Sequence, residues 1–265
     1  MQSQFDAVVI AGYDPARPDA VAAQHGVDRK VLIPMAGRPM VWYLVRALAA
    51  SPRVARIVIA GMGPEDGVDF GREVEYVPNQ GRLFANAYAG VEHLARSQEW
   101  DRHVLVSSAD IPAIPADAVD WFLDACRPYD KDVYMAVVEK RVMEATFPNS
   151  QRSYMRLVEG QFCNGTLTLV RIEPALHKQQ VIQDLIDRRK HIFRQLQLLG
   201  WRVVLKFIFR RLTLADITGL TRRLIDAESV AVIAPYAQIG MDVDKPHQFD
   251  QVLAYMQQHP VDPGT

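Results

Sequence analysis

AVVIAG at residues 7–12 and KVLIPMAGRP at residues 30–39 are the two most informative runs in this sequence. The first run is apolar and rich in β-branched residues, which predicts a buried strand ending at the small pair Ala11 and Gly12. The second run presents Lys30, then a glycine and a proline, ahead of an apolar segment of helical period. A cation on the loop that follows the first strand is suited to a triphosphate, although an isolated loop lysine is more often a solvated surface charge.

Short β-branched runs alternate with segments of helical period through the first half of the chain. Strands are predicted near 6–11, 54–60, 72–77, 103–108 and 132–138, and helices near 39–50, 83–97 and 115–126. This alternation predicts an α/β fold, an open and mostly parallel Rossmann-like sheet with right-handed crossovers and helices on both faces. Ligands of such sheets bind outside the carboxyl ends of the strands, so the residues that follow each strand are the candidates for a site.

The pattern changes after Pro148. Residues 153–170 are predicted as two strands around a turn, and residues 176–227 as wholly helical, with Thr213 as the N-cap of one helix. A last strand at 229–234 is expected to return to the sheet, followed by a loop at 240–246 and a final helix at 247–258. We therefore expect one domain over residues 1–265, with a helical insertion over residues 171–228.

Composition excludes several classes of protein. A net charge of -1 gives no general attraction to nucleic acid, so no nucleic-acid partner is expected. Two cysteines without ligand-like spacing predict neither a disulfide framework nor a zinc site. No export signal is visible and no apolar run approaches the length of a membrane span, so we expect a cytoplasmic protein.

Carboxylates occupy two places where the predicted sheet should present ligands. Asp110 follows the strand at 103–108, and Asp242 and Asp244 alternate within the run GMDVDKP at residues 240–246. Alternating side chains of an extended segment face the same way, and carboxylate oxygens are suited to Mg²⁺. The other interpretation is that Asp110 occupies a turn before the next helix, and that one of the later pair caps the last helix.

The run NQGRLFAN at residues 79–86 follows the strand that ends near Val77. A glycine loop that opens a helix offers backbone N–H groups, and Asn86 adds an amide, so Gly81 and Asn86 are candidates for contact with a base or a ribose. Asn79 is a further candidate. An ordinary strand-to-helix turn is the alternative.

Together these features resemble the nucleotidyltransferase superfamily that includes the molybdenum cofactor guanylyltransferases, the sugar-phosphate nucleotidylyltransferases and the cytidylyltransferases. The resemblance leaves residues 150–228 largely uncovered. It implies transfer of NMP from an NTP to a phosphorylated acceptor, with release of pyrophosphate and with Mg²⁺ as cofactor. It implies these roles: Lys30 on the triphosphate, Asp110 and Asp244 on Mg²⁺, and Ala11, Gly12, Gly81 and Asn86 on the nucleotide. Asp242 is a further metal candidate, and Asn164 lies where related enzymes face the acceptor, although Asn164-Gly165 is equally a turn signal.

One segment departs from the family pattern. Residues 13–19 read YDPARPD, where family members have a Gly-rich segment with an arginine. The phosphate loop is therefore expected to have a different shape, with Arg17 as the candidate for the missing arginine.

Two other functions stay open. The first is a nucleotide-sugar-dependent glycosyltransferase of the same fold, although such enzymes usually place Asp-x-Asp where this chain has Asp110-Ile111-Pro112. The second is a non-catalytic binding or membrane-surface protein with a degenerate site. Residues 188–211 motivate the second, because they contain eight basic residues, four interleaved aromatic residues and no Asp or Glu. A helix pair with an apolar inner side and a solvated basic side explains the same pattern.

Overall fold

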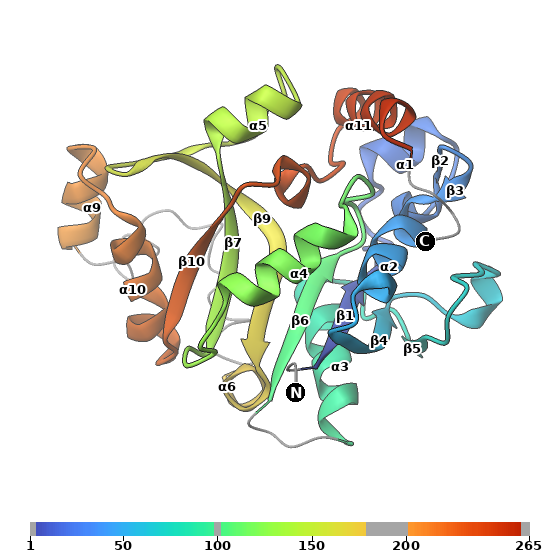
Figure 1. The fold of residues 1–265 in the computed structure, drawn as a ribbon, viewed down its shortest axis with the longest axis horizontal. Coiled ribbons are helices and arrows are strands. Elements are labelled where there is room, and N and C mark those ends of the chain that lie inside the picture. The colour runs from blue at the N-terminus through green and yellow to red at the C-terminus, as the bar shows by residue number, and fades with distance from the viewer. Residues whose placement is uncertain (1–3, 98–101, 179–200, 261–265) are drawn as a thin grey trace.

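The computed structural model describes residues 4–97, 102–178 and 201–260. Within these ranges a mixed sheet of eight strands crosses the centre of the molecule (Figure 1), in the order β10-β7-β9-β6-β1-β4-β5 with β8 paired to β9. The strands are β1 (Phe5–Ile10), β4 (Val54–Ala60), β5 (Glu75–Val77), β6 (His103–Ser108), β7 (Val133–Glu139), β8 (Met155–Leu157), β9 (Gly160–Arg171) and β10 (Ser229–Ala234). Neighbours are parallel except for β9, which runs antiparallel to β6, β7 and β8. The predicted open, mostly parallel α/β sheet is confirmed.

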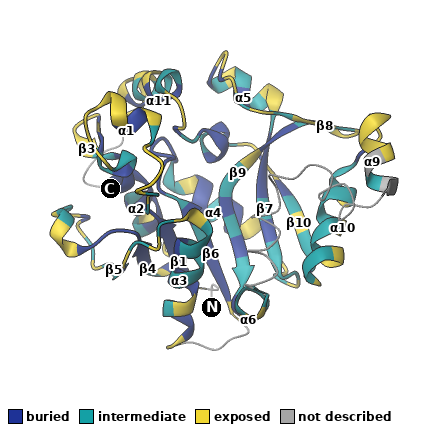
Figure 2. Cartoon of the chain, turned by 180° about the vertical axis from the view of Figure 1, so that it is seen from behind, coloured by how far each residue is buried: buried dark blue, intermediate teal, exposed yellow. Residues whose placement is uncertain are grey.

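Both faces of the sheet are buried at the central strand β1. Val8 and Val9 are successive residues of β1 and neither is exposed, yet they belong to separate hydrophobic clusters on opposite faces. One cluster includes α2 (Met40–Ala50) and α4 (Ala116–Ala125), and the other includes α3 (Leu83–Ala95) and the start of α6 (Ile172–His177). Figure 2 shows the buried residues concentrated along the central strands. This is the arrangement that continuous apolar strands favour, because both of their faces need cover.

The loop between β1 and α2 is more structured than its sequence predicts. It contains a short helix α1 (Ala20–Gln24), the 3₁₀ helix η1 (Lys30–Leu32) and a tight hairpin of β2 (Pro34–Met35) and β3 (Arg38–Pro39). Asp19 caps α1, because its carboxylate accepts hydrogen bonds from the backbone N–H groups of Val21 and Ala22. These elements bring Lys30 back to the carboxyl end of β1.

The second half of the chain follows the prediction in most respects. β8 and β9 form the expected pair of strands, and β10 returns to the edge of the sheet beside β7. The 3₁₀ helix η3 (Ala237–Gly240) and a loop then lead to α11 (Pro246–Gln258). The short helix α5 (Lys140–Thr146) and the 3₁₀ helix η2 (Pro64–Asp66) were not predicted.

A wholly helical segment over residues 176–227 is wrong for the part that the structure describes. α6 ends at His177, α9 spans Trp201–Ile208 and α10 spans Leu214–Ile225, with a non-helical connection between the last two. Arg210 adopts a positive φ of 54° in that connection, which interrupts the helix. The predicted N-cap at Thr213 is confirmed, because its hydroxyl accepts a hydrogen bond from the Asp216 N–H in a capping box. Residues 179–200 of the predicted segment lie outside the described residues.

Candidate functional site

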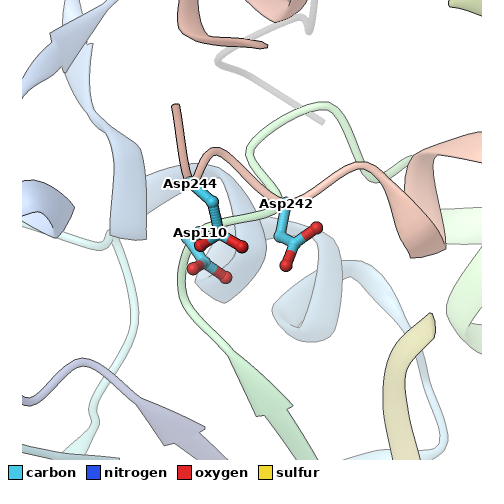
Figure 3. A group of neighbouring side chains, drawn as sticks. All are labelled: Asp110, Asp242 and Asp244. Carbon is cyan, nitrogen blue, oxygen red and sulfur yellow. The ribbon is translucent and has the colours of Figure 1, made fainter. Parts of the chain in front are cut away.

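Three carboxylates meet at the carboxyl end of β6 (Figure 3). One oxygen from each of Asp110, Asp242 and Asp244 lies within 4.8 Å of the others. The backbone holds the two segments together, since the N–H of Val243 donates a hydrogen bond of 2.9 Å to the carbonyl oxygen of Asp110. The loop before α11 therefore runs alongside the end of β6, and the alternation of Asp242 and Asp244 turns both side chains toward Asp110.

Lys30 lies against this carboxylate cluster, defined as Asp110, Asp242 and Asp244. Its Nζ atom is 2.8 Å from Oδ2 of Asp110, 3.3 Å from Oδ1 of Asp244 and 3.8 Å from Oδ2 of Asp19. Burial by itself would lower the pKa of Lys30, but the carboxylate charges outweigh burial and raise it. For Asp110, burial would raise the pKa, and the charge and hydrogen bond of Lys30 lower it. Both groups are therefore charged at neutral pH.

A second cation, Arg152, was missed by the sequence analysis. Its guanidinium group pairs with Asp242 and lies 4.0 Å from Asp244. Burial, together with the charges of Asp110 and Asp244, still raises the pKa of Asp242 to about 7 against the opposing effect of Arg152. Lys30 and Arg152 thus do not fully balance the negative charge of the three carboxylates.

The loop that carries Arg152 is fixed by Gln248 of α11. Its Oε1 atom accepts hydrogen bonds from the backbone N–H groups of Asp244 and Lys245, and its amide donates to the carbonyl oxygen of Ser150. Gln248 is 1% exposed, and a polar residue on the buried face of a helix is the signal that would have drawn attention to it. Arg152 has no such signal, because its neighbours in the sequence form no recognisable motif.

The carboxylate cluster is suited to a divalent cation. All of its donors are oxygens, which hard cations such as Mg²⁺ prefer. The Oδ1 atom of Asp110 is buried and accepts no hydrogen bond from the part of the chain that the structure describes, which is costly for a carboxylate oxygen unless a cation or a donor meets it. Asp110, Asp242 and Asp244 are the residues that would hold the ion.

A cleft of about 730 Å³ opens beside the cluster, at the carboxyl end of β1. Its lining includes Ala11, Gly12, Arg17, Lys30, Gly81, Asp110 and Asp244. A Cβ atom on Gly12 would lie 2.1 Å from the side-chain nitrogen of Asn86, so no larger residue fits there. The volume is in the range of small-molecule sites.

Asn86 and Asn79 lie behind this cleft and are absent from its lining. Asn86 is fully buried; its amide accepts a hydrogen bond from the Gln80 N–H and donates to Oδ1 of Asn79 and to the Arg82 carbonyl oxygen. Asn79 in turn exchanges hydrogen bonds with the backbone of Tyr13. The two amides therefore join loop 79–82 to loop 13–19. We expect them to shape the wall of the cleft and not to contact the ligand directly.

The loop over residues 13–19 places Arg17 in the lining of the cleft, so this residue is positioned to act as the predicted substitute arginine. Its side chain is 68% exposed and lies 3.9 Å from the carboxylate of Asp14. A long, exposed pair of this kind contributes little to stability, so Arg17 is available to a ligand but is not held in one position. Asn164 lies in an adjoining cleft, described below, on the other side of the carboxylate cluster.

The chain belongs to the MobA-like NTP transferase domain family, whose model matches residues 7–191. A structure described as a hypothetical transferase from Thermus thermophilus is 31% identical, covers 93% of this chain and 99% of its own, and superposes with a TM-score of 0.80. The bifunctional protein GlmU of Rhizorhabdus wittichii is 31% identical over 110 residues, which are 41% of this chain and 24% of that longer protein.

Two more distant structures share the fold. CMP:2-keto-3-deoxy-manno-octonic acid synthetase, in complex with CTP, covers 97% of this chain and all of its own at 17% identity, with a TM-score of 0.58. 4-Diphosphocytidyl-2C-methyl-D-erythritol synthase also covers 97% of this chain and all of its own, at 9% identity and a TM-score of 0.59. The family match confirms the predicted membership of the nucleotidyltransferase superfamily and supports nucleotidyl transfer as the general activity, whereas these two structures show the fold alone.

Proposed function

We propose that this protein transfers NMP from a nucleoside triphosphate to a phosphorylated acceptor, with release of pyrophosphate and with Mg²⁺ as cofactor. The observation that carries the proposal is the contact of Lys30 with Asp110 and Asp244 in the cleft at the carboxyl end of β1. A lysine that faces the cleft and a set of oxygen ligands beside it match the two requirements of a triphosphate, which are charge neutralisation and a divalent ion.

In this reaction an oxygen of the acceptor phosphate forms a bond to the α-phosphorus, and the bond from that phosphorus to the bridging oxygen of pyrophosphate breaks. Mg²⁺ bound to the carboxylate cluster would supply Lewis-acid polarisation of phosphate oxygens. Lys30 exchanges its carboxylate partners for oxygens of the triphosphate and neutralises charge on the leaving group. Arg152 stays on Asp242 and holds that carboxylate in place. The chain thereby contributes position and charge, and no covalent nucleophile is needed.

A thermal-shift panel tests the proposal. ATP, GTP, CTP and UTP are each added with and without Mg²⁺, since a ligand that binds the folded state alone stabilises it by about 2.7 kcal/mol at one hundred times its Kd. We expect a shift of several degrees with at least one triphosphate and a much smaller shift when EDTA replaces Mg²⁺. Pyrophosphate release would then identify the acceptor. A shift with nucleotide sugars and none with any triphosphate would contradict the proposal and favour a glycosyltransferase.

We further propose a peripheral membrane contact through residues 188–211, of which residues 201–211 are described. Four apolar side chains in this part of the chain are between 41% and 68% exposed, namely Leu205, Phe207, Ile208 and Phe209. Arg210 and Arg211 follow them in the sequence. Exposed apolar side chains beside basic ones favour the surface of an anionic bilayer. No described helix is long and apolar enough to span a bilayer.

Vesicle sedimentation tests this contact. Binding to vesicles with 30% anionic lipid is expected to exceed binding to neutral vesicles, to weaken with salt, and to fall at least a hundredfold in the double variant Phe207→Ser and Phe209→Ser, since two buried aromatic side chains together contribute about 3–6 kcal/mol. Ile233→Ser is the matched control, because Ile233 is 48% exposed but lies on β10. Equal sedimentation of the double variant and the wild type would contradict the contact.

A further inference from the structure

A second cleft, of about 570 Å³, opens on the other side of the carboxylate cluster. Asp110, Asp244 and Ser108 line both clefts, together with Ile10 and Phe84. The two clefts therefore meet at the carboxylates. A ligand in the second cleft has one end where the α-phosphate of a triphosphate in the first cleft would lie.

The second cleft lies over β6 and β9 on one face of the sheet. On this side of the sheet α3 packs against β1 and β4, and α10 packs against β10. β6 and β9 lie between these helices and form the floor. Side chains that would otherwise be covered by a helix, such as Val106 and Val170, are half-buried here.

Most of the lining between the two ends is apolar. Val106, Thr168 and Val170 form the floor. The walls come from α3 (Tyr88 and Val91), from Ala175 of α6, from Ile225 at the end of α10 and from Ala227 just after it. The hydroxyl of Thr166 is already engaged, because it donates to the carbonyl oxygen of Ile239 at 3.1 Å. Few other polar side chains line this middle part, among them Tyr88 and Thr168, so a sugar would leave some of its hydroxyl groups without partners, at a cost of about 1–3 kcal/mol each.

Charge is confined to the two ends of the cleft. The carboxylate cluster lies at one end, and at the other Arg171 lies 3.5 Å from Asp132. A phosphate head group is suited to the metal side, where a divalent ion would offset the carboxylates and Arg152 already pairs with Asp242. The middle is suited to an aliphatic or ring hydrocarbon.

We infer that the acceptor is an amphiphile, with its phosphate at the carboxylate cluster and an apolar body along Val106, Thr168 and Val170. The inference rests on the proposed function and specifies the acceptor class for it. The acceptor phosphate supplies the attacking oxygen, and the apolar body fixes its orientation without reacting. Binding energy of the body is thereby used to position the head group.

A series of monoalkyl phosphates tests the inference by direct binding. Methyl, butyl, hexyl and octyl phosphate are titrated calorimetrically into the wild-type protein with Mg²⁺, below their micellar concentrations. Burial of each methylene is expected to tighten the Kd by about fourfold until the cleft is filled. Thr168→Arg, which fills the floor, should remove this dependence on chain length while leaving the thermal shift by triphosphate and Mg²⁺ unchanged.

Two further variants make the test specific. Ala175→Gln narrows the same cleft from α6 and replaces Thr168→Arg if that variant does not fold. Gln161→Arg is the matched control, because Gln161 is on β9 but outside the cleft, and it should retain the full dependence on chain length.

The outcomes separate the inference from the proposed function. A normal thermal shift with triphosphate and Mg²⁺, combined with a Kd for the alkyl phosphates that does not change with the length of their alkyl chain, would overturn the amphiphilic acceptor. The proposed nucleotidyl transfer would stay intact. Equal length dependence in the wild type, Thr168→Arg and Ala175→Gln would overturn the assignment to this cleft. Absence of any triphosphate shift would overturn the proposed function and, with it, the acceptor role of the cleft.

Discussion

Replacement of Asp110 by asparagine is expected to reduce turnover by about a thousandfold or more, with little change in the fold. Asp110 contacts Lys30 at 2.8 Å and lies within reach of both other carboxylates, so it joins the proposed metal site to the cation of the triphosphate site. Asparagine has the same shape but lacks the charge. Loss of one group that stabilises charge in a transition state typically costs a hundredfold to a thousandfold in rate, and loss of the ion adds to this.

The measurement is pyrophosphate release with saturating Mg²⁺, accompanied by circular dichroism and the Tm of each protein. Asp250→Asn is the control, because Asp250 is an exposed aspartate of α11 outside both clefts. Its turnover should match that of the wild type. Undiminished, Mg²⁺-dependent turnover in Asp110→Asn would show that the carboxylate cluster is not the catalytic site.

The second large effect is expected for Lys30→Met, which should weaken triphosphate binding by about a hundredfold. Lys30 is 13% exposed and contacts two carboxylates of the cluster, and removing one partner of a charge pair buried in a binding site typically costs about 2–5 kcal/mol of binding free energy. In this variant the triphosphate loses this cation, and Asp110 and Asp244 lose the positive charge of Lys30. Isothermal titration with the triphosphate that gives the largest thermal shift measures the change.

The same variant should be less stable without Mg²⁺, and the loss should depend on pH. In the wild type, Lys30 holds the pKa of Asp110 below its usual value, so this pair stabilises the fold above the unfolded pKa of an aspartate, about 3.9. Without Lys30, burial raises the pKa of Asp110 instead. The Tm of Lys30→Met is therefore expected to fall furthest below the wild type at pH 8, and the difference should shrink as the pH is lowered toward 5.

Arg17→Met is the matched control for Lys30→Met. Arg17 lines the same cleft, but it is exposed and its pair with Asp14 is long, so its loss should change triphosphate affinity by no more than about fivefold. Affinity in Lys30→Met equal to that of the wild type would contradict the role of Lys30. A larger loss in Arg17→Met than in Lys30→Met would transfer that role to loop 13–19.

The sequence was sufficient for those parts of the fold and the site that depend on local pattern. Apolar runs with strand or helix periodicity predicted β1, β4, β6, β7 and the main helices, because local burial pattern decides the type of each element. The placement of Lys30, Asp110 and Asp244 at one edge of the sheet was expected for a related reason, because ligands of such sheets bind at the carboxyl ends of the strands; the direct contact of Lys30 with the two carboxylates was not predicted. Each of these residues follows or adjoins a recognisable strand or motif.

The sequence was not sufficient for contacts between segments that carry no motif. Arg152 reaches Asp242 because Gln248 ties two distant loops together, and Asn86 turns away from the cleft because its amide is used by loop 79–82. Whether the floor of β6 and β9 is covered depends on where helices from other parts of the chain pack. Local periodicity specifies which residues are buried, whereas the partners of a buried charge and the hollow between helices result from long-range packing.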